Sequence, residues 1–200
     1  MIVGFIGKKQ SGKSTAAKYL ANKYDLKRVN FKDGLLRELK ERCPDLLAEM
    51  VKTFNELSYQ GITNWTVDGL FDVKPPLMRS LLQNYGTNVR RVDDPLHWIK
   101  EWRKATANLP GVVVDDVRFL NEADAIKTRS GILIRINRVG LESNDQHISE
   151  VEMDSIEPDF TITVQTGDFA SLYSQVNEVI MNAYGEVPTP ALPNPAEVLA

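Results

Sequence analysis

The sequence predicts an α/β fold in which a five-stranded parallel sheet lies between two layers of helices. Short apolar segments alternate with segments of helical composition along much of the chain, as in parallel sheets joined by right-handed helical crossovers. The first apolar segment leads directly into a loop rich in glycine and lysine. A long stretch between residues 32 and 109 has helical composition with little strand signal, which predicts a helical insertion.

The N-terminal elements follow from apolar runs and small packing residues. Residues 2–6 form an apolar run without alternation, as expected of a strand covered on both faces. After the loop, residues 13–24 predict a helix that packs through alanine, leucine and tyrosine. Residues 29–31 suggest a short second strand.

The expected insertion contains four helical segments and no clear strand. They cover residues 34–42, 44–58, 76–85 and 95–108. We expect a subdomain that grips a substrate.

The remaining strands and helices resume the alternation. Residues 112–114 are three valines followed by two aspartates, a strong signal for a buried strand. Residues 119–129 predict a helix, 132–136 and 160–164 predict strands, and 169–184 predict the last helix.

The whole pattern predicts one domain over residues 1–185. It would contain the helical insertion at about 32–109 and a lid at about 138–150, while the proline-rich tail 186–200 is expected to be disordered. The chain of 200 residues is 42% hydrophobic and 26% charged, the balance of a globular domain.

Charge and cysteine content limit the classes of partner. The net charge of −3 and pI near 5.5 give no global basic field, so we expect no nucleic-acid partner, and local Lys and Arg must meet any anionic substrate. Cys43 is the only cysteine, and no apolar run approaches 18 residues. We therefore expect no intrachain disulfide, no membrane partner and a cytoplasmic location.

The loop after the first strand has the motif G-x-x-x-x-G-K-[ST]. Its glycines let successive backbone N–H groups point at phosphate oxygens, and the following helix adds the positive end of its dipole. Lys13 is expected to reach the β- and γ-phosphates, and the Ser14 hydroxyl to ligate Mg²⁺. The context of strand, loop and helix predicts the P-loop NTPase class. The predicted ATP-binding residues here are Gly7, Lys9, Ser11, Gly12, Lys13, Ser14 and Thr15.

A phosphate loop alone does not distinguish kinases from other nucleotide-binding proteins. The guanine-binding motif Asn-Lys-x-Asp is matched only at residues 22–25, inside the first predicted helix, where it could not reach a base. This disfavours a GTPase, and nothing in the sequence suggests a motor.

A second phosphate-site signal is the acidic end of the valine strand, where a carboxylate could hold Mg²⁺ or its water. Asp115 and Asp116 point to opposite faces, so only one can serve. Asp116 is favoured, with Arg118 on the same side for an acceptor phosphate, although either aspartate could instead cap a turn or helix.

Other basic and aromatic residues are weaker candidates. Arg138 opens a polar loop with the character of a lid, and Lys32 would follow the second strand toward the cleft. Trp98 and Trp102 lie four residues apart on a predicted helix, which indicates a core face unless one of them stacks on a base. Trp65 could serve a homodimer contact or pack in the core.

Five segments together resemble the deoxynucleoside monophosphate kinases of T-even-like bacteriophages and their relatives. They read GKKQSGKST, RSLLQNYGTN, DPLHWIKEW, VVVDDVRFLNEADA and SNDQHISE. The resemblance implies the nucleoside monophosphate kinase fold and transfer of phosphate from ATP to a dNMP with Mg²⁺, giving dNDP and ADP for phage DNA synthesis in the host cytoplasm.

The resemblance also assigns roles to residues. It implies that Lys13 and its loop bind ATP and that Arg138 is a lid arginine bound to ATP. The catalytic residues would be Lys13, Asp116, Arg118 and Arg138. The acceptor site would contain Lys32, Arg79, Gly86, Thr87, Trp98, Arg118 and Glu122.

Two departures from the family and two rival functions remain. The segment between Lys32 and Arg79 is shorter than in the T-even proteins, so base selectivity there cannot be transferred. Ser14 replaces an aspartate of the T-even proteins, which makes its expected Mg²⁺ role more like that in other P-loop enzymes. The role of residues 144–150 is open.

The acceptor could instead be another small phosphorylated metabolite, or the chain could be a regulatory or assembly module that hydrolyses ATP slowly.

Overall fold

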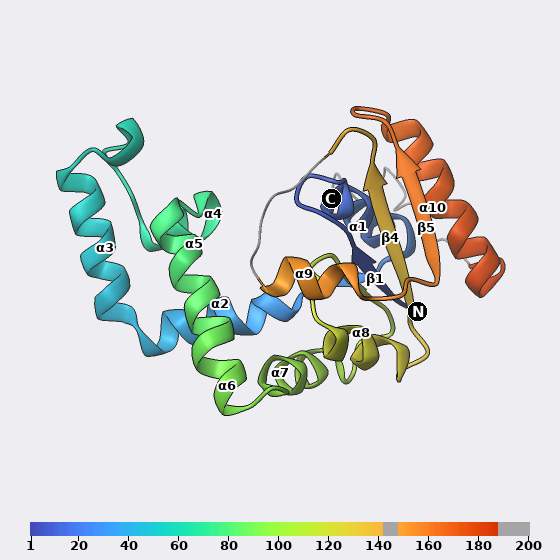
Figure 1. The fold of residues 1–200 in the computed structure, drawn as a ribbon, viewed down its shortest axis with the longest axis horizontal. Helices are drawn as coiled ribbons and strands as arrows, with labels where there is room; N and C mark the ends of the chain where they lie inside the picture. The colour runs from blue at the N-terminus through green and yellow to red at the C-terminus, as the bar shows by residue number, and fades with distance from the viewer. Residues whose placement is uncertain (142–147, 188–200) are drawn as a thin grey trace, which may run out of the picture. The chain divides into compact units, whose positions relative to one another are not determined.

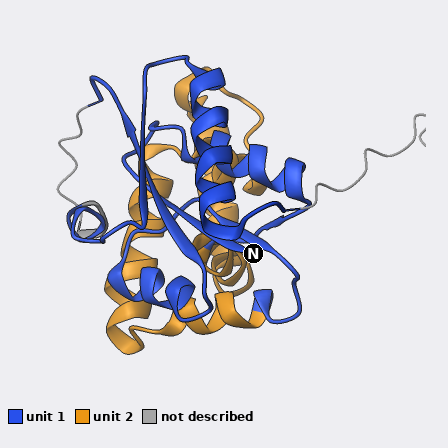
Figure 2. Cartoon of the chain, turned by 90° about the vertical axis from the view of Figure 1, so that its right-hand side faces the viewer, with its two compact units in different colours: residues 1–30, 105–200 blue, residues 31–104 orange. Residues whose placement is uncertain are grey.

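The computed structural model describes residues 1–141 and 148–187, which form two compact units. One unit is built from residues 1–30 and the described residues from 105 onward, the other from residues 31–104 (Figure 2). Compactness does not decide how many domains fold independently, so the expected single domain with an insertion and a lid stays a prediction. Most of the expected tail and part of the expected lid lie outside the described residues.

The first unit is organised around a five-stranded parallel sheet with strand order β2-β3-β1-β4-β5 (Figure 1). Gly4 of the central strand lies opposite Val114 on one side and Leu133 on the other. The strands are β1 (Ile2–Ile6), β2 (Lys27–Arg28), β3 (Val112–Val114), β4 (Ile132–Arg138) and β5 (Phe160–Val164). This confirms the predicted α/β class with a parallel sheet.

Helices cover both faces of this sheet, which gives the three layers expected of a P-loop fold. On one face, α1 and α10 pack against apolar side chains of the inner strands, such as Val3 and Phe5. On the other face, Ile126 of α8 packs close to Gly4. The helices of this unit are α1 (Lys13–Tyr24), α8 (Leu120–Lys127), α9 (Ile148–Asp154) and α10 (Phe169–Tyr184).

The prediction of a second strand at residues 29–31 is wrong. The strand is Lys27–Arg28, both of them exposed, at the edge of the sheet. The Val29 N–H still donates to the Val113 carbonyl at 3.2 Å, but Phe31 already begins helix α2. The Phe31 ring packs against Trp102, with ring centroids 5.0 Å apart. This packing explains why an apolar residue occupies position 31.

The second unit is helical. A cluster of buried apolar side chains that includes Leu39, Phe54 and Met78 forms its core. Trp65 lies in this cluster and is 4% exposed, which confirms core packing. The elements are α2 (Phe31–Arg42), α3 (Pro44–Glu56), the 3-10 helix η1 (Tyr59–Gly61), α4 (Val67–Val73), α5 (Pro76–Gln83), the π-helix η2 (Asn84–Arg90), α6 (Arg91–Asp93) and α7 (His97–Thr106), whose last two residues belong to the first unit.

Helix α7 presents its tryptophans to the protein interior. Trp98 and Trp102 are 3% and 2% exposed, as the core-face interpretation of their spacing predicts. Among the described residues, no helix combines the length and apolar character needed to cross a membrane.

Candidate functional site

The loop between β1 and α1 has the backbone conformation of a phosphate cradle. Gly7, Gln10 and Gly12 have φ angles of +143°, +68° and +110°, so the chain reverses sharply before the helix begins at Lys13. The Ser11 N–H closes the turn by donating to the Lys8 carbonyl at 3.1 Å. Helix α1 starts at the end of this loop, and its first N–H groups add positive potential there.

Gly7 is required by both conformation and space. A Cβ at this position would lie 2.4 Å from the Ile136 carbonyl oxygen and 2.9 Å from Ser11 Oγ. Residues with a side chain rarely adopt a φ of +143°. The start of the loop therefore depends on glycine.

Two side chains of the loop are placed to meet anionic oxygens. Lys13 Nζ donates to the Gly7 and Lys8 carbonyls at 2.5 and 2.6 Å, which holds the ammonium against the loop. Ser11 is 2% exposed, and its hydroxyl has no hydrogen-bond partner among the described residues. Buried hydroxyls normally have partners, and a phosphate oxygen in the loop would supply one.

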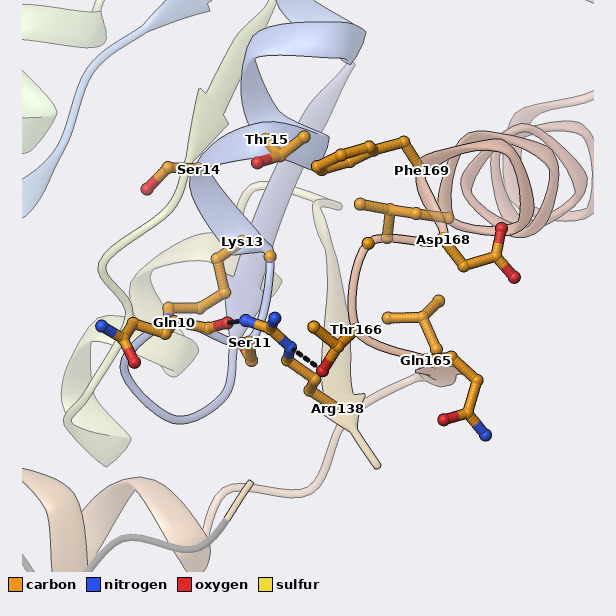
Figure 3. Close-up of a pocket in the computed structure, with 14 residues that line it drawn as sticks. Gln10, Ser11, Lys13, Ser14, Thr15, Arg138, Gln165, Thr166, Asp168 and Phe169 are labelled. Carbon is orange, nitrogen blue, oxygen red and sulfur yellow. Dashed lines mark hydrogen bonds between the residues drawn. The ribbon is translucent and has the colours of Figure 1, made fainter. Parts of the chain in front are cut away.

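A cavity of about 400 Å³ opens beside the loop. Five of the seven predicted loop residues line it, whereas Gly7 and Lys9 do not. Figure 3 shows it between the start of α1 and the segment after β5. Its lining residues are Gln10, Ser11, Gly12, Lys13, Ser14, Thr15, Arg138, Val164, Gln165, Thr166, Gly167, Asp168, Phe169 and Leu172.

Arg138 joins the two walls of this cavity. Its Nη1 donates to the Gln10 carbonyl at 2.8 Å, and its Nε donates to Thr166 Oγ1 at 2.9 Å (Figure 3). The strand β4 continues to Arg138, two residues beyond the expected end. Arg138 is thus the last residue of a strand rather than part of a loop, and its role as a lid arginine stays a prediction.

Sequence reasoning missed the wall formed by residues 165–169. Asp168 caps α10, since its carboxylate accepts the Ser171 N–H at 3.0 Å, and Phe169 is 55% exposed beside the cavity. A signal was present: Gln165 to Asp168 form a polar turn at the carboxyl end of a parallel strand, where ligands of open α/β sheets bind.

The two aspartates after β3 have different surroundings. The side chain of Asp115 is fully buried and pairs with Arg28 at 2.8 Å, and its N–H donates to Asn30 Oδ1 at 2.9 Å. Asp116 is partly exposed. Asp115 thus contacts Arg28 of the edge strand β2. Asp116 is accessible at the carboxyl end of β3, the strand that pairs with β1.

Arg118 and Glu122 follow Asp116 and are linked to each other. Glu122 is 3% exposed, and its Oε2 accepts the N–H groups of Arg118 and Phe119 at 2.9 and 3.3 Å. This caps the start of α8 and fixes the backbone of Arg118. A direct contact between Glu122 and an acceptor stays a prediction.

The other predicted acceptor residues lie in the helical unit. Lys32 belongs to the first turn of α2 and does not follow a strand, which corrects the expectation that placed it at a strand end. Arg79 is exposed on α5, while Gly86 and Thr87 belong to η2. Trp98 Nε1 donates to the Gly86 carbonyl at 3.0 Å, so Trp98 contacts the π-helix at Gly86. Their roles stay predictions.

The predicted segment 144–150 is described only in part. Residues 142–147 lie outside the described residues, as do the side chains of 148–150, and only the backbone of 148–150 is placed, at the start of α9. Among the described residues, no group of three or more His, Cys, Asp or Glu could hold a metal ion by itself.

The sequence is similar to viral proteins named for one activity. It is 33% identical over 200 residues to a candidate deoxynucleotide monophosphate kinase of Acanthamoeba polyphaga mimivirus, and the match covers 92% of this chain and 97% of that protein. Deoxynucleotide monophosphate kinases of Escherichia phage RB69 and Enterobacteria phage T4 are 29% and 28% identical over 109 residues, or 52% of this chain. Those matches span 44% and 45% of the phage proteins.

No protein-family model matches the chain. Among solved structures, a dephospho-CoA kinase from Campylobacter jejuni has a TM-score of 0.45 at 16% identity, covering 90% of this chain and 96% of that one. A shikimate kinase from Aquifex aeolicus has a TM-score of 0.44 at 12% identity, covering 93% and 100%.

Proposed function

Because the chain belongs to the deoxynucleotide monophosphate kinase family, we propose that it transfers the γ-phosphoryl group of ATP to a deoxynucleoside monophosphate, giving dNDP and ADP. The observation that carries this proposal is the similarity over nearly the whole length of the mimivirus protein. The phosphate loop supports it, since the loop supplies the donor site that such a transfer requires.

ATP would bind in the cavity beside the phosphate loop. Its phosphates would accept hydrogen bonds from the loop N–H groups, from the buried Ser11 hydroxyl and from Lys13. The nucleoside would lie in the remainder of the cavity, toward Thr166 and Phe169. An exposed aromatic ring there offers a face on which a base can stack.

Mg²⁺ would be held by oxygen ligands at the start of α1 and the end of β3. The Ser14 hydroxyl is exposed and lines the cavity, and Asp116 is a partly exposed carboxylate. Mg²⁺ sites usually combine one or two protein oxygens with waters and substrate phosphates, so these residues fit the ion. When bound, Mg²⁺ would neutralise charge on the β- and γ-phosphates.

The acceptor would be gripped by cations and by the π-helix region. Lys32 and Arg79 would meet its phosphate together with Arg118, whose backbone Glu122 fixes. Thr87 would lie at the base and sugar, with the buried Gly86 and Trp98 supporting it from behind. Arginine forks suit phosphate oxygens because they bind them bidentately.

The chemistry would be direct in-line transfer. An acceptor phosphate oxygen is already nucleophilic near neutral pH, so little help from a general base is needed. Lys13, Arg118 and Arg138 would stabilise the charge that develops on the transferred group. The segment 138–150 would act as a lid and limit hydrolysis of ATP by water.

Replacing Arg138 by alanine should raise the KM for ATP about tenfold, the effect of losing hydrogen bonds from a charged group. Arg138 connects Gln10 to Thr166 across the cavity, so its loss should loosen the donor site. The KM for the acceptor should change less than twofold. Thr166→Val, which removes one of the two bonds, should give a smaller change in the same direction. An unchanged KM for ATP in Arg138→Ala would contradict this role.

A direct assay tests the proposed function. The protein is incubated with Mg·ATP and, in separate reactions, with dAMP, dCMP, dGMP, dTMP or hydroxymethyl-dCMP, and nucleoside diphosphate is quantified. We expect dNDP from at least one of the five and slow ATP consumption without an acceptor. Consumption of ATP with no dNDP from any of them would overturn the proposal and favour a module that only hydrolyses ATP.

A further inference from the structure

The π-helix η2 is an irregular part of the helical unit. It spans Asn84–Arg90 between α5 and α6. A π-helical turn is rare and occurs often at functional sites, so its persistence requires contacts that fix it. It contains Gly86 and Thr87, which the proposed function places at the acceptor.

The side chain that fixes this π-helix is Glu38 of α2. One carboxylate oxygen, Oε1, accepts the Tyr85 hydroxyl at 2.9 Å and also accepts Arg90 Nη2. The other oxygen, Oε2, lies 2.6 Å from Nε2 of His97, the first residue of α7. Because an ionised carboxylate only accepts, His97 is the donor. One carboxylate thus joins α2, η2 and α7.

Burial and neighbouring hydrogen-bond donors set the ionisation state of the Glu38 carboxyl. Glu38 is 9% exposed. Burial by itself would raise the pKa of the Glu38 carboxyl, but the hydrogen bonds from His97, Tyr85 and Arg90 outweigh it and lower the pKa below its ordinary value. The carboxylate is therefore ionised at neutral pH and balances the Arg90 guanidinium, which also lies over the Tyr85 ring at 5.5 Å.

A second contact fixes the backbone of the same segment. Trp98 follows His97 on α7, and its indole N–H donates to the Gly86 carbonyl at 3.0 Å. The His97 and Trp98 rings meet edge to face, with centroids 4.4 Å apart. Helix α7 thus contacts the backbone of the π-helix directly through Trp98. It is linked to the π-helix side chains Tyr85 and Arg90 through Glu38, which accepts hydrogen bonds from both of them and from His97.

We propose that Glu38 is a positioning residue for the acceptor: it holds the π-helix, with its buried Gly86, in the shape that presents the partly exposed Thr87 to the deoxynucleotide. This inference rests on the proposed function. Glu38 belongs to the unit of residues 31–104, whereas the phosphate loop belongs to the other unit. Its loss should therefore affect binding of the acceptor and leave binding of ATP unchanged.

The test is Glu38→Gln in the full chain, with KM and kcat measured for ATP and for the best dNMP. Glutamine keeps the size of the side chain but has one acceptor oxygen and no charge, so it cannot serve Tyr85, Arg90 and His97 together. We expect the KM for the dNMP to rise about tenfold, with the KM for ATP and kcat within about twofold of wild type.

A matched control removes the same charge from the same helix. Glu41 is exposed on α2, and Glu41→Gln should leave all the kinetic constants unchanged. Tyr85→Phe removes a single hydroxyl and should raise the dNMP KM less than Glu38→Gln does. It also decides the matter if Glu38→Gln does not fold.

The outcomes separate this inference from the proposed function. If the wild-type protein makes no dNDP, the proposed function itself is contradicted. If the wild type is active, an unchanged KM for the dNMP in Glu38→Gln would overturn the positioning role. An equal rise in the KM for ATP and the KM for the dNMP would also overturn it. If Glu38→Gln is unfolded, an unchanged dNMP KM in Tyr85→Phe has the same meaning.

Discussion

Replacing Lys13 by alanine should lower kcat by about 10²–10³-fold, the effect of removing one preorganised donor to charge that develops in a transition state. Lys13 Nζ is held at 2.5 and 2.6 Å from two loop carbonyls, beside the cavity expected to bind ATP. Alanine cannot reach the β- and γ-phosphates, so their charge would be balanced less well in the transition state.

The measurement is the initial rate of dNDP formation with saturating Mg·ATP and dNMP. Lys18→Ala is the matched control, because Lys18 is an exposed cation on the same helix that does not line the cavity. It should retain wild-type kcat, and both variants should unfold cooperatively near the wild-type temperature. Near-normal turnover by Lys13→Ala would contradict the assignment of the donor site.

Replacing Gly7 by alanine should raise the Kd for ATP by one to two powers of ten. The added methyl group would lie 2.4 Å from the Ile136 carbonyl oxygen, in a backbone conformation that alanine rarely adopts. Such backbone strain costs about 1–3 kcal/mol before any steric clash is counted, and each 1.4 kcal/mol corresponds to about tenfold in Kd. The loop would relieve the clash by moving its N–H groups away from the phosphates.

The control for this variant is Gly61→Ala. Gly61 also has a positive φ, +75°, but a Cβ there would meet nothing within 4 Å. Equilibrium titration with ATP should show unchanged binding for Gly61→Ala and weak binding for Gly7→Ala. Equal affinities in the two variants would show that the contact with Ile136 does not set the loop conformation.

The sequence predicted those elements whose local signal agrees with their environment. The segments 2–6, 112–114 and 160–164 became strands with those bounds, and residues 13–24 and 169–184 became helices with those bounds. Strands β1 and β3 are buried throughout and need continuous apolar runs, and β5 at the sheet edge alternates apolar residues with threonine, so the sequence marks the ends of all three.

Elements whose stability comes from distant contacts were missed or misplaced. Strand β2 consists of two exposed basic residues, so it has no apolar signal, and the apolar Phe31 beside it packs inside the helical unit. Helix α4 and the π-helix were not predicted either. No local rule predicts a π-helix from its own residues, because the contacts that hold it come from other helices.

The candidate site divides in the same way. The phosphate loop was recognisable because its chemistry is local in sequence, and five of its seven predicted residues line a cavity. The opposite wall, with Thr166 and Phe169, lies about 150 residues further along the chain and became visible only in the structure. A glutamate on a helix usually faces solvent, so nothing in the sequence indicated that Glu38, besides pairing with Arg42 four residues along its own helix, contacts residues 47 to 59 positions away.

The most direct test of the central claim is a single-turnover reaction with ATP labelled at its γ-phosphate, Mg²⁺ and the dNMP that gives most product. The proposed function predicts that label enters the β-phosphate of the dNDP at the rate at which ADP forms. Label recovered only as inorganic phosphate, with the dNMP unchanged, would contradict it.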